Sequence, residues 1–457
     1  MANNLLDKAS IILTPTAYNN GEALCVKPSD GSGDFDFSRN SAATRVNAQG
    51  LVENVQILSS NLVQNGDFSE EGVQEVSNGS FSQEGVQLIT NGDFENGSAN
   101  WNFQLGWTFD NGQAHFENLG SSNRNLWQSP LVNGNWYKLT FEITSITSGY
   151  IRNVNSSVTD DTQFSTIGVH TQYFQAANVN LYLKASVDAN LSIDNVSVRE
   201  VAQNWSLGTG WSIAEDKAVA VSGASSRLEQ PISGLSGKTC KISFTLSDYG
   251  GGGAVYVDFG SVNSDLINTN GEHVVYGTFD QDNFELFKGA AFSGSITNIS
   301  VKEVGQNWTL QTGWSIADGK ASAVASTQAA YQSGVTLAVG NKYLCSFEIT
   351  DYTSGQIVFA CGSGGLGTNR SANGVYTEVI VAGTGNIILL DGIGGTGAFT
   401  GSITNISVIE ITDDTNLPRI NYEGFSYQDA LGSELITNGD FATDLSGWSS
   451  ITNVTWS

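Results

Sequence analysis

The side chains that could carry covalent or acid–base chemistry are few and far apart in this chain of 457 residues. Its only histidines, His115, His170 and His273, lack repeated carboxylate or cysteine neighbours. The sequence has no Gly-x-Ser-x-Gly elbow, no phosphate-binding loop and no His-Glu-x-x-His helix. Glycosidase carboxylates could be present among the 45 acidic residues, but repeated modules normally bind or space. We therefore expect a protein that is not an enzyme.

The four cysteines, Cys25, Cys240, Cys345 and Cys361, have no C-x-x-C spacing. With three histidines in the chain, they also make a poor supply of zinc ligands. We expect reduced, structural thiols, as in a protein synthesised in a cytoplasm.

The net charge of -26 restricts the partners of the chain. A field of this sign repels nucleic acid and anionic lipid at long range. The sequence has no run of 18 or more apolar residues, the length needed to span a bilayer. Residues 1–13 also lack the pattern of a secretory signal. We expect no nucleic-acid binding and no membrane insertion.

The composition favours strands and tight turns over helices. Charged residues are only 14% of the chain and glycine contributes 52 residues, whereas β-branched and aromatic residues are plentiful. Stretches such as 138–144 and 345–350 alternate polar and apolar side chains, which indicates strands with one buried face. The fold class predicted is all-β: tandem antiparallel sandwich modules after a small N-terminal docking segment.

Internal repeats predict the domain organisation. Residues 203–214 recur almost unchanged at 306–317, and residues 294–304 recur at 401–411. The division predicted is a docking segment 1–60, repeat stubs or a linker 61–87, three sandwich modules 88–201, 202–304 and 305–411, a linker 412–433, and the start of a fourth module at 434–457. The stubs cannot bury a core alone, so we interpret them as added strands or linkers.

Aromatic side chains are the candidates for carbohydrate binding, because aromatic rings stack on the C–H faces of sugars. Tryptophans that recur in every copy, such as Trp107, Trp211 and Trp314, are expected to fill cores. Aromatic residues found in a single copy are the better ligand candidates, and they are Trp127, Trp136, Tyr150, Tyr173, Tyr352 and Tyr376. Packing is the competing interpretation for each of them.

The opening Asn-Gly-Asp-Phe at 91–94, the later tryptophan and the closing Ile-Asp-Asn-Val-Ser-Val at 193–198 resemble galactose-binding-like jelly-roll carbohydrate-binding modules. The resemblance covers residues 88–411 and implies jelly rolls whose first and last strands run together. It also implies a structural calcium, for which Glu95 and Asp194 are the candidate ligands in the first module. In the other modules Asn298 and Asn405 replace Asp194, and in the first Asp194 could simply cap a turn.

Residues 35–55, which begin Phe-Asp-Phe-Ser-Arg-Asn-Ser-Ala-Ala-Thr-Arg-Val, resemble a phrase of tailed-bacteriophage virion proteins. Its usual continuation, Asn-x-Pro-Arg-Ile-Asx-Tyr, stands far downstream at 416–422, as if the modules were inserted into one motif. The Leu-Leu-Glu-Pro-Gln phrase that normally follows is absent after Tyr422. Arg39 and Arg45 are the candidate virion-docking residues, unless they pair within their own fold.

These resemblances imply a structural component of a phage virion, a fibre or appendage that is assembled in the host cytoplasm and displays its modules to host-surface glycans. The expected partners are other phage virion proteins and further copies of this chain, as a homo-oligomer such as a trimer. The alternative is a head-decoration or adaptor protein whose modules act as spacers without binding a ligand. A secreted glycan-degrading enzyme would need a signal peptide.

Overall fold

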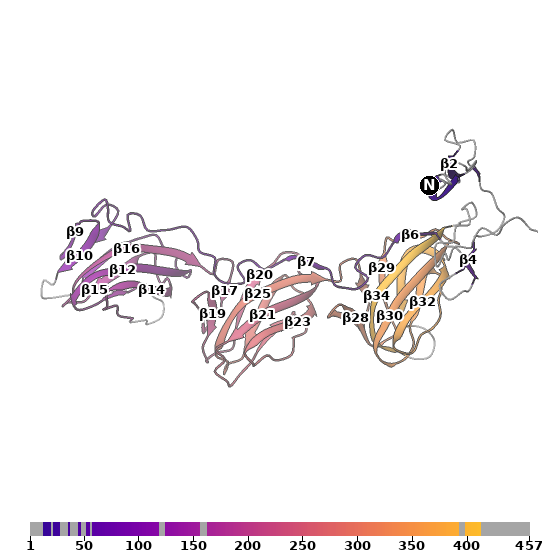
Figure 1. Ribbon diagram of the computed structural model, residues 1–457. Helices are drawn as coiled ribbons and strands as arrows, with labels where there is room; N and C mark the ends of the chain where they lie inside the picture. The colour runs from indigo at the N-terminus through magenta and orange to yellow at the C-terminus, as the bar shows by residue number, and fades with distance from the viewer. Residues whose placement is uncertain are drawn as a thin grey trace, which may run out of the picture.

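The computed structural model describes residues 12–19, 22–27, 35–36, 44–46, 52–54, 57–117, 124–155, 162–392 and 398–412. Every regular element among them is a strand, and the paired strands are antiparallel. Figure 1 shows three sandwiches that follow one another in a row. The expected all-β fold of tandem jelly-roll sandwiches is confirmed. Within these ranges no helix is long and apolar enough to cross a bilayer.

Module 1 packs a five-stranded sheet, in the order β14-β12-β16-β10-β9, against a four-stranded sheet, β13-β15-β11-β8. Side chains alternate between buried and half-buried along β12, so one face of each sheet supplies the core. The strand bounds are β8 (Asn102–Phe103), β9 (Trp107–Asp110), β10 (Gln113–Glu117), β11 (Arg124–Gln128), β12 (Trp136–Ser148), β13 (Ile151–Asn153), β14 (Gly168–Gln175), β15 (Leu181–Ala185) and β16 (Asn190–Val201).

Module 2 repeats this arrangement with the sheets β18-β19-β25-β21-β23 and β17-β20-β24-β22. Its strands are β17 (Ser206–Leu207), β18 (Trp211–Ala214), β19 (Lys217–Ala220), β20 (Ser226–Pro231), β21 (Thr239–Ser247), β22 (Val255–Asp258), β23 (Gly271–Thr278), β24 (Asn283–Lys288) and β25 (Gly294–Val304).

Module 3 has the sheets β27-β28-β34-β30-β32 and β26-β29-β33-β31. Its strands are β26 (Thr309–Leu310), β27 (Trp314–Ala317), β28 (Lys320–Ser326), β29 (Ala329–Ser333), β30 (Lys342–Ser354), β31 (Val358–Ser363), β32 (Gly374–Val381), β33 (Thr384–Asp391) and β34 (Phe399–Thr412). The last long strand of each module, β16, β25 or β34, lies in the middle of its larger sheet, and we call it the closing strand.

The N-terminal part of the chain contributes seven strands. β1, β2 and β3 form one small sheet, and β4 pairs with β5. Their bounds are β1 (Ile12–Asn19), β2 (Glu22–Lys27), β3 (Phe35–Asp36), β4 (Thr44–Val46), β5 (Val52–Asn54), β6 (Ile57–Asn61) and β7 (Glu71–Gln74). The last two strands belong to the sandwiches: β6 pairs with β34 of module 3, and β7 pairs with β25 of module 2.

The stubs predicted for residues 61–87 are therefore integral parts of the modules. Val63 and Phe68 lie in the core of module 3, and Val76 and Phe81 lie in the core of module 2. The chain passes modules 3, 2 and 1 in that order, folds module 1, and then returns through modules 2 and 3. The predicted units 202–304 and 305–411 are thus incomplete alone, because each lacks an opening that stands before residue 88.

Each module receives its opening from one of three consecutive 13-residue segments, which we call the opening segments: 57–69 for module 3, 70–82 for module 2 and 83–95 for module 1. Gly66, Gly79 and Gly92 occupy the same place in them. Their carbonyls accept hydrogen bonds of 2.9, 2.9 and 2.8 Å from backbone N–H groups of the closing strands, at Ile406, Ile299 and Val196. A Cβ at any of the three glycines would lie within 2.1 Å of a closing-strand carbonyl oxygen, so no larger residue fits.

One tryptophan in each module fixes the bend of its opening segment. The indole Nε1 of Trp308 donates to the carbonyls of Gln64 and Asn65, both at 3.1 Å. Phe68 lies against the same indole, with ring centroids 5.1 Å apart. Trp205 with Phe81 and Trp101 with Phe94 repeat this arrangement. The recurrent tryptophans are buried, as their recurrence predicted; Trp448 lies outside the described residues.

This nested path of the chain places the points where it enters and leaves the row of three modules, its two exits, on the same module. β6 enters along the closing strand β34, and the chain leaves the described structure at the end of β34, so both lie at module 3 (Figure 1). Module 1 lies at the other end of the row.

We predict that Phe81→Ala destabilises module 2 by about 3–5 kcal/mol, because it removes a fully buried ring from that core. Hydrogen exchange measured by mass spectrometry should show faster exchange in β21 and β25. Val73→Ala is the control, since Val73 is 78% exposed on the same segment. Faster exchange confined to module 1, which follows Phe81 directly in sequence, would contradict the nested arrangement.

Candidate functional site

The outer face of the four-stranded sheet in module 1 carries an aromatic pair. Along β11 and β15 apolar residues turn inward, and Trp127 and Tyr182 occupy half-buried, outward positions. The two residues are cross-strand partners with ring centroids 6.0 Å apart. Trp127 was predicted as a ligand candidate, whereas Tyr182 was not. The alternation Leu-Tyr-Leu-Lys-Ala at 181–185 is the signal that identifies Tyr182 as outward-facing.

Polar groups surround this pair on the same face. Asn102 on the edge strand β8 is exposed and lies opposite Trp127. Asn180 Nδ2 donates to the hydroxyl of Tyr182 at 3.0 Å. Lys184 is the next outward residue of β15 and lies opposite Asn125. A flat ring beside amide, hydroxyl and ammonium groups suits a sugar ring, which has apolar C–H faces and a polar rim.

The equivalent face of module 2 is also aromatic, a feature that the sequence analysis missed. Tyr256 and Phe287 stack with centroids 4.9 Å apart and an interplanar angle of 26°. Arg227 lies over Phe287, at 6.0 Å from the ring centroid, and its Nε lies 2.9 Å from the carboxylate of Glu285. Arg227 therefore covers one side of the stack in module 2.

Two further candidates, Trp136 and Tyr173, lie at the junction between modules 1 and 2. Both pack against the core of module 2, although they belong to strands of module 1. Tyr276 holds the place of Tyr173 in module 2 and packs in the same way against the core of module 3. Burial raises the pKa of both phenols. The recurrence of this contact assigns Tyr173 to the packing between modules, and Trp136 lies at the same junction.

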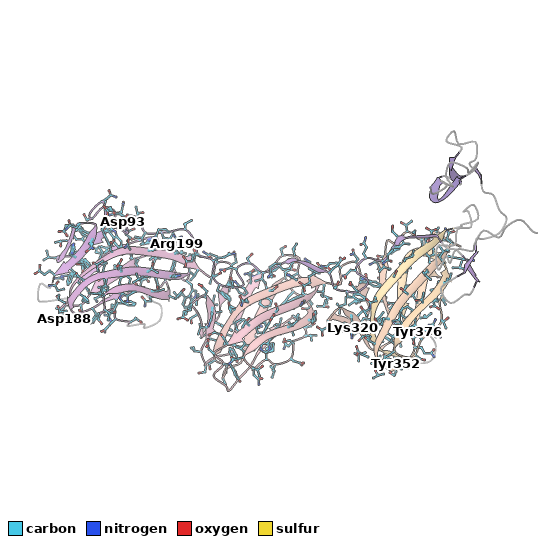
Figure 2. All side chains as sticks on the ribbon, viewed as in Figure 1. Asp93, Asp188, Arg199, Lys320, Tyr352 and Tyr376 are labelled. Atoms are coloured by element: carbon cyan, nitrogen blue, oxygen red, sulfur yellow. The ribbon has the colours of Figure 1, made fainter. Side chains whose placement is uncertain are left out.

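The other three aromatic candidates are Tyr150 in module 1 and Tyr352 and Tyr376 in module 3. The backbone N–H of Tyr150 donates to Ser186 Oγ at 3.0 Å, and this hydroxyl donates at 2.7 Å to Asp188, which Figure 2 places at the end of module 1 away from module 2. In module 3, Tyr352 and Tyr376 pack against the core, and their hydroxyls donate to the carbonyls of Gly355 and Ala372. Figure 2 labels both on the body of module 3.

The predicted docking residues are described only in part. Arg39 lies outside the described residues. Arg45 lies in β4, opposite Glu53 of β5 in the backbone register. Their predicted contact with other virion proteins remains a prediction.

The calcium site at Glu95 and Asp194 stays a prediction. One part of it is wrong: Thr297 and Thr404 take the place of Asp194 in the other modules, whereas Asn298 and Asn405 share the positive φ of Asn195. Asp194 Oδ1 accepts a hydrogen bond of 2.6 Å from the backbone N–H of Asn195, a residue with a φ of 53°, so this carboxylate caps a turn. Burial first, and then Glu142 and Asp93, raise the pKa of Asp194; Glu95 is not among its charged neighbours. In the part of the chain that the structure describes, no three His, Cys, Asp or Glu side chains gather as metal ligands would.

Grooves lie around the opening segments and the module junctions. One of about 670 Å³ lies at the junction of modules 1 and 2, with Trp136 and Trp205 in its lining. Others measure about 430 Å³ beside Trp308 and about 290 Å³ beside Tyr276. Several polar groups of the groove between modules 1 and 2 bond internally: Asn135 Nδ2 donates to Glu200 at 3.0 Å, and Gln203 Nε2 donates to the carbonyl of Glu200 at 2.9 Å. The aromatic face around Trp127 is therefore the better ligand candidate.

Cys240, Cys345 and Cys361 are buried thiols. Burial raises the pKa of Cys240 to about 12. The Sγ atoms of Cys345 and Cys361 lie 3.3 Å apart as free thiols, and their mutual hydrogen bond together with burial raises the pKa of Cys345. A thiol with a raised pKa stays protonated near neutral pH and reacts slowly.

No protein-family model and no curated protein matches this sequence. Among solved structures, a chain from the study "Life in the extremes: atomic structure of Sulfolobus Turreted Icosahedral Virus" is 13% identical, with 68% of this chain and 90% of that chain covered and a TM-score of 0.18. A chain from "The Triple Jelly Roll Fold and Turret Assembly in an Archaeal Virus" is 11% identical, with 69% and 90% covered and a TM-score of 0.17. Overlaps with TM-scores this low do not bear on the function of the present chain.

We predict that Tyr173→Ala exposes the side of module 2 that faces module 1. The tyrosine covers part of that core, and β14 contacts β18, so hydrogen exchange should accelerate in β18 and β19. The expected change is roughly threefold to tenfold, which corresponds to a loss of about 1 kcal/mol. Val169→Ala, on the same strand at a 72% exposed position, should leave this exchange unchanged.

We also predict that Cys240, Cys345 and Cys361 resist thiol reagents at pH 8 while the protein is folded. Their burial excludes the reagent, and the raised pKa values of Cys240 and Cys345 keep those thiolates scarce. Peptide mapping after labelling with and without denaturant measures this. Rapid labelling of Cys240 in folded protein would contradict the burial described here.

Proposed function

We propose that this chain is a structural component of a virus particle, a fibre or appendage that is attached at its module 3 end and projects module 1 outward. The observation that carries this proposal is the nested path of the chain, which brings both exits to one end of the row. This arrangement suits a projecting arm, because attachment at module 3 leaves the far module free.

The positions of the phage-like phrases support the same direction. The first phrase ends at Val55, two residues before β6 begins at Ile57. The second begins at Asn416, four residues after β34 ends at Thr412. Both phrases are thus covalently next to module 3 and remote from module 1. We assign virion attachment to the residues that carry them, with other virion proteins as partners and a homo-oligomer as the attached form.

We further propose that module 1 binds host-surface glycans on the face formed by Trp127 and Tyr182. Module 1 is the outermost module in this orientation, and its outward aromatic pair is flanked by hydrogen-bonding groups. A sugar stacked on one aromatic pair binds weakly, and several copies of the chain on one particle would bind a glycan surface more tightly together. The proposal includes no catalytic step.

One observation favours the alternative, in which the modules only act as spacers. Trp136 and Tyr173, which the sequence offered as ligand residues, support the junction with module 2. In that case the protein would be a head-decoration or adaptor protein, and the aromatic face of module 1 would have no ligand.

Removal of residues 1–55 should leave the three modules folded and abolish incorporation into particles. This truncation spares β6, whose loss would open the sheet of module 3. Hydrogen exchange of β34 checks the fold, and quantitative mass spectrometry of purified particles measures the copy number. A normal copy number would exclude attachment through this segment.

Glycan binding should fall at least about tenfold in the full-length variants Trp127→Ala and Tyr182→Ala, because each removes half of the aromatic pair. Val169→Ala, an exposed apolar residue on the other sheet of module 1, is the matched control. A glycan array that includes host polysaccharides gives the readout. No binding by the unaltered chain to any host polysaccharide would favour the spacer function.

A further inference from the structure

The three opening segments share every feature that makes them fit a sandwich. Each has an asparagine with positive φ, the closely packed glycine, and a phenylalanine that contacts a tryptophan: Asn65, Gly66 and Phe68 in the first segment, and equivalent residues 13 and 26 positions later. These common features cannot determine which segment enters which module. The segments are also consecutive, so a shift of 13 residues would present a good backbone fit to the wrong module.

Among the positions at which the opening segments differ, two carry a distinct combination of charged and apolar residues in each module. The first is occupied by Leu58, Glu71 and Glu84, and the second, four residues later, by Leu62, Glu75 and Leu88. The first position has the same backbone partner in each closing strand, namely Ile411, Val304 and Val201. The combinations are Leu/Leu for module 3, Glu/Glu for module 2 and Glu/Leu for module 1. No two modules share a combination.

In module 2 both glutamates contact lysines. Glu71 lies 2.7 Å from Lys241 and 2.9 Å from Lys302, two cross-strand partners of β21 and β25. These hydrogen bonds lower the pKa of Glu71. Glu75 lies 2.7 Å from Lys238. Module 2 thus supplies three cations to an opening segment that brings two carboxylates.

In module 1 only the first position meets cations. Glu84 lies 2.6 Å from Lys138 and 3.6 Å from Arg199, which are cross-strand partners at the places of Lys241 and Lys302. Figure 2 shows Arg199 toward the end of module 1 that faces module 2. The second position, Leu88, packs against the core of module 1. Asn135, in the place of Lys238, instead donates to Glu200 at 3.0 Å.

In module 3 the places of the cations are taken by apolar and amide side chains. The cross-strand pair that corresponds to the two lysines is Leu344 and Ile409. Leu62 packs against the core of module 3, and Asn341 donates to Glu410 at 2.5 Å. The side chains that receive the opening segment are therefore apolar or already bonded.

We propose that the residues at these two positions direct each opening segment to its own module. We call each pair the address of its segment, and the pairs are 58 and 62, 71 and 75, and 84 and 88. We call the cations or apolar residues that face each address its receivers. An opening segment in the wrong module would leave lysines without their carboxylates, or would set a carboxylate against Leu344 and Ile409. Such mismatches cost free energy and leave the correct nesting favoured. The same address selects the correct segment if a second copy of the chain supplies it.

The test transplants the address of module 3 into module 2 of the full-length chain. Glu71→Leu with Glu75→Leu gives the segment the Leu/Leu combination while the lysines remain. Exchange of the β7 amides should become roughly tenfold faster, because Lys241 and Lys302 lose their carboxylate partner and Lys238 keeps only Glu303, at 3.6 Å. Adding Lys241→Leu, Lys302→Ile and Lys238→Asn installs the receivers of module 3 and should restore exchange to within about threefold of the unaltered chain.

Glu70→Leu is the control, because Glu70 is exposed and adjacent, and the described residues give its side chain no ion pair. Unchanged exchange is expected there, and unchanged exchange in β30 and β34 shows that module 3 is intact. The proposal is overturned if the two-residue variant exchanges like the control. It is also overturned if the five-residue variant exchanges as fast as the two-residue variant, because the glutamates would then stabilise module 2 without being matched to its receivers.

Discussion

The close backbone contact between each opening segment and its closing strand is the interaction on which the architecture depends. Gly66, Gly79 and Gly92 allow an approach that any Cβ would block, and the carbonyl of each accepts a hydrogen bond from the closing strand. The contact joins parts of the chain that lie far apart in sequence, most of all in module 3, where residue 66 meets residue 406. Because the entropy of closing a loop grows only with the logarithm of its length, a whole pair of modules can be accommodated between the two partners.

The nested path has a mechanical consequence that a simple string of domains would not have. The backbone crosses each junction twice, once between consecutive opening segments and once on its return from module 1. Neighbouring modules are therefore joined by two covalent connections. Tyr173 and Tyr276 add side-chain packing at the two junctions. A doubly connected, packed junction resists bending better than a single flexible linker, which suits an arm that must hold its outer module away from an attachment point.

In the proposed function, the same arrangement separates attachment from recognition. Residues next to the phage-like phrases lie at module 3, whereas the aromatic face of Trp127 and Tyr182 lies on module 1. The residues that face the opening segments also differ along the row. They are cationic in modules 1 and 2 and apolar in module 3.

The sequence by itself determined the fold class, because alternation, turn residues and repeats depend on neighbouring residues and are visible without coordinates. It also determined which tryptophans are buried, since a residue that recurs in every copy serves what the copies share. The partners of residues 61–87 were decided by the tertiary structure: Phe68 and Phe81 contact tryptophans more than 100 residues away, and local patterns carry no information on such distant pairing. The tertiary structure also decided how Trp127 and Trp136 differ. Trp127 faces outward beside Tyr182, whereas Trp136 packs at a junction between modules. Both are single-copy tryptophans in β-strands, and only the neighbouring module distinguishes them.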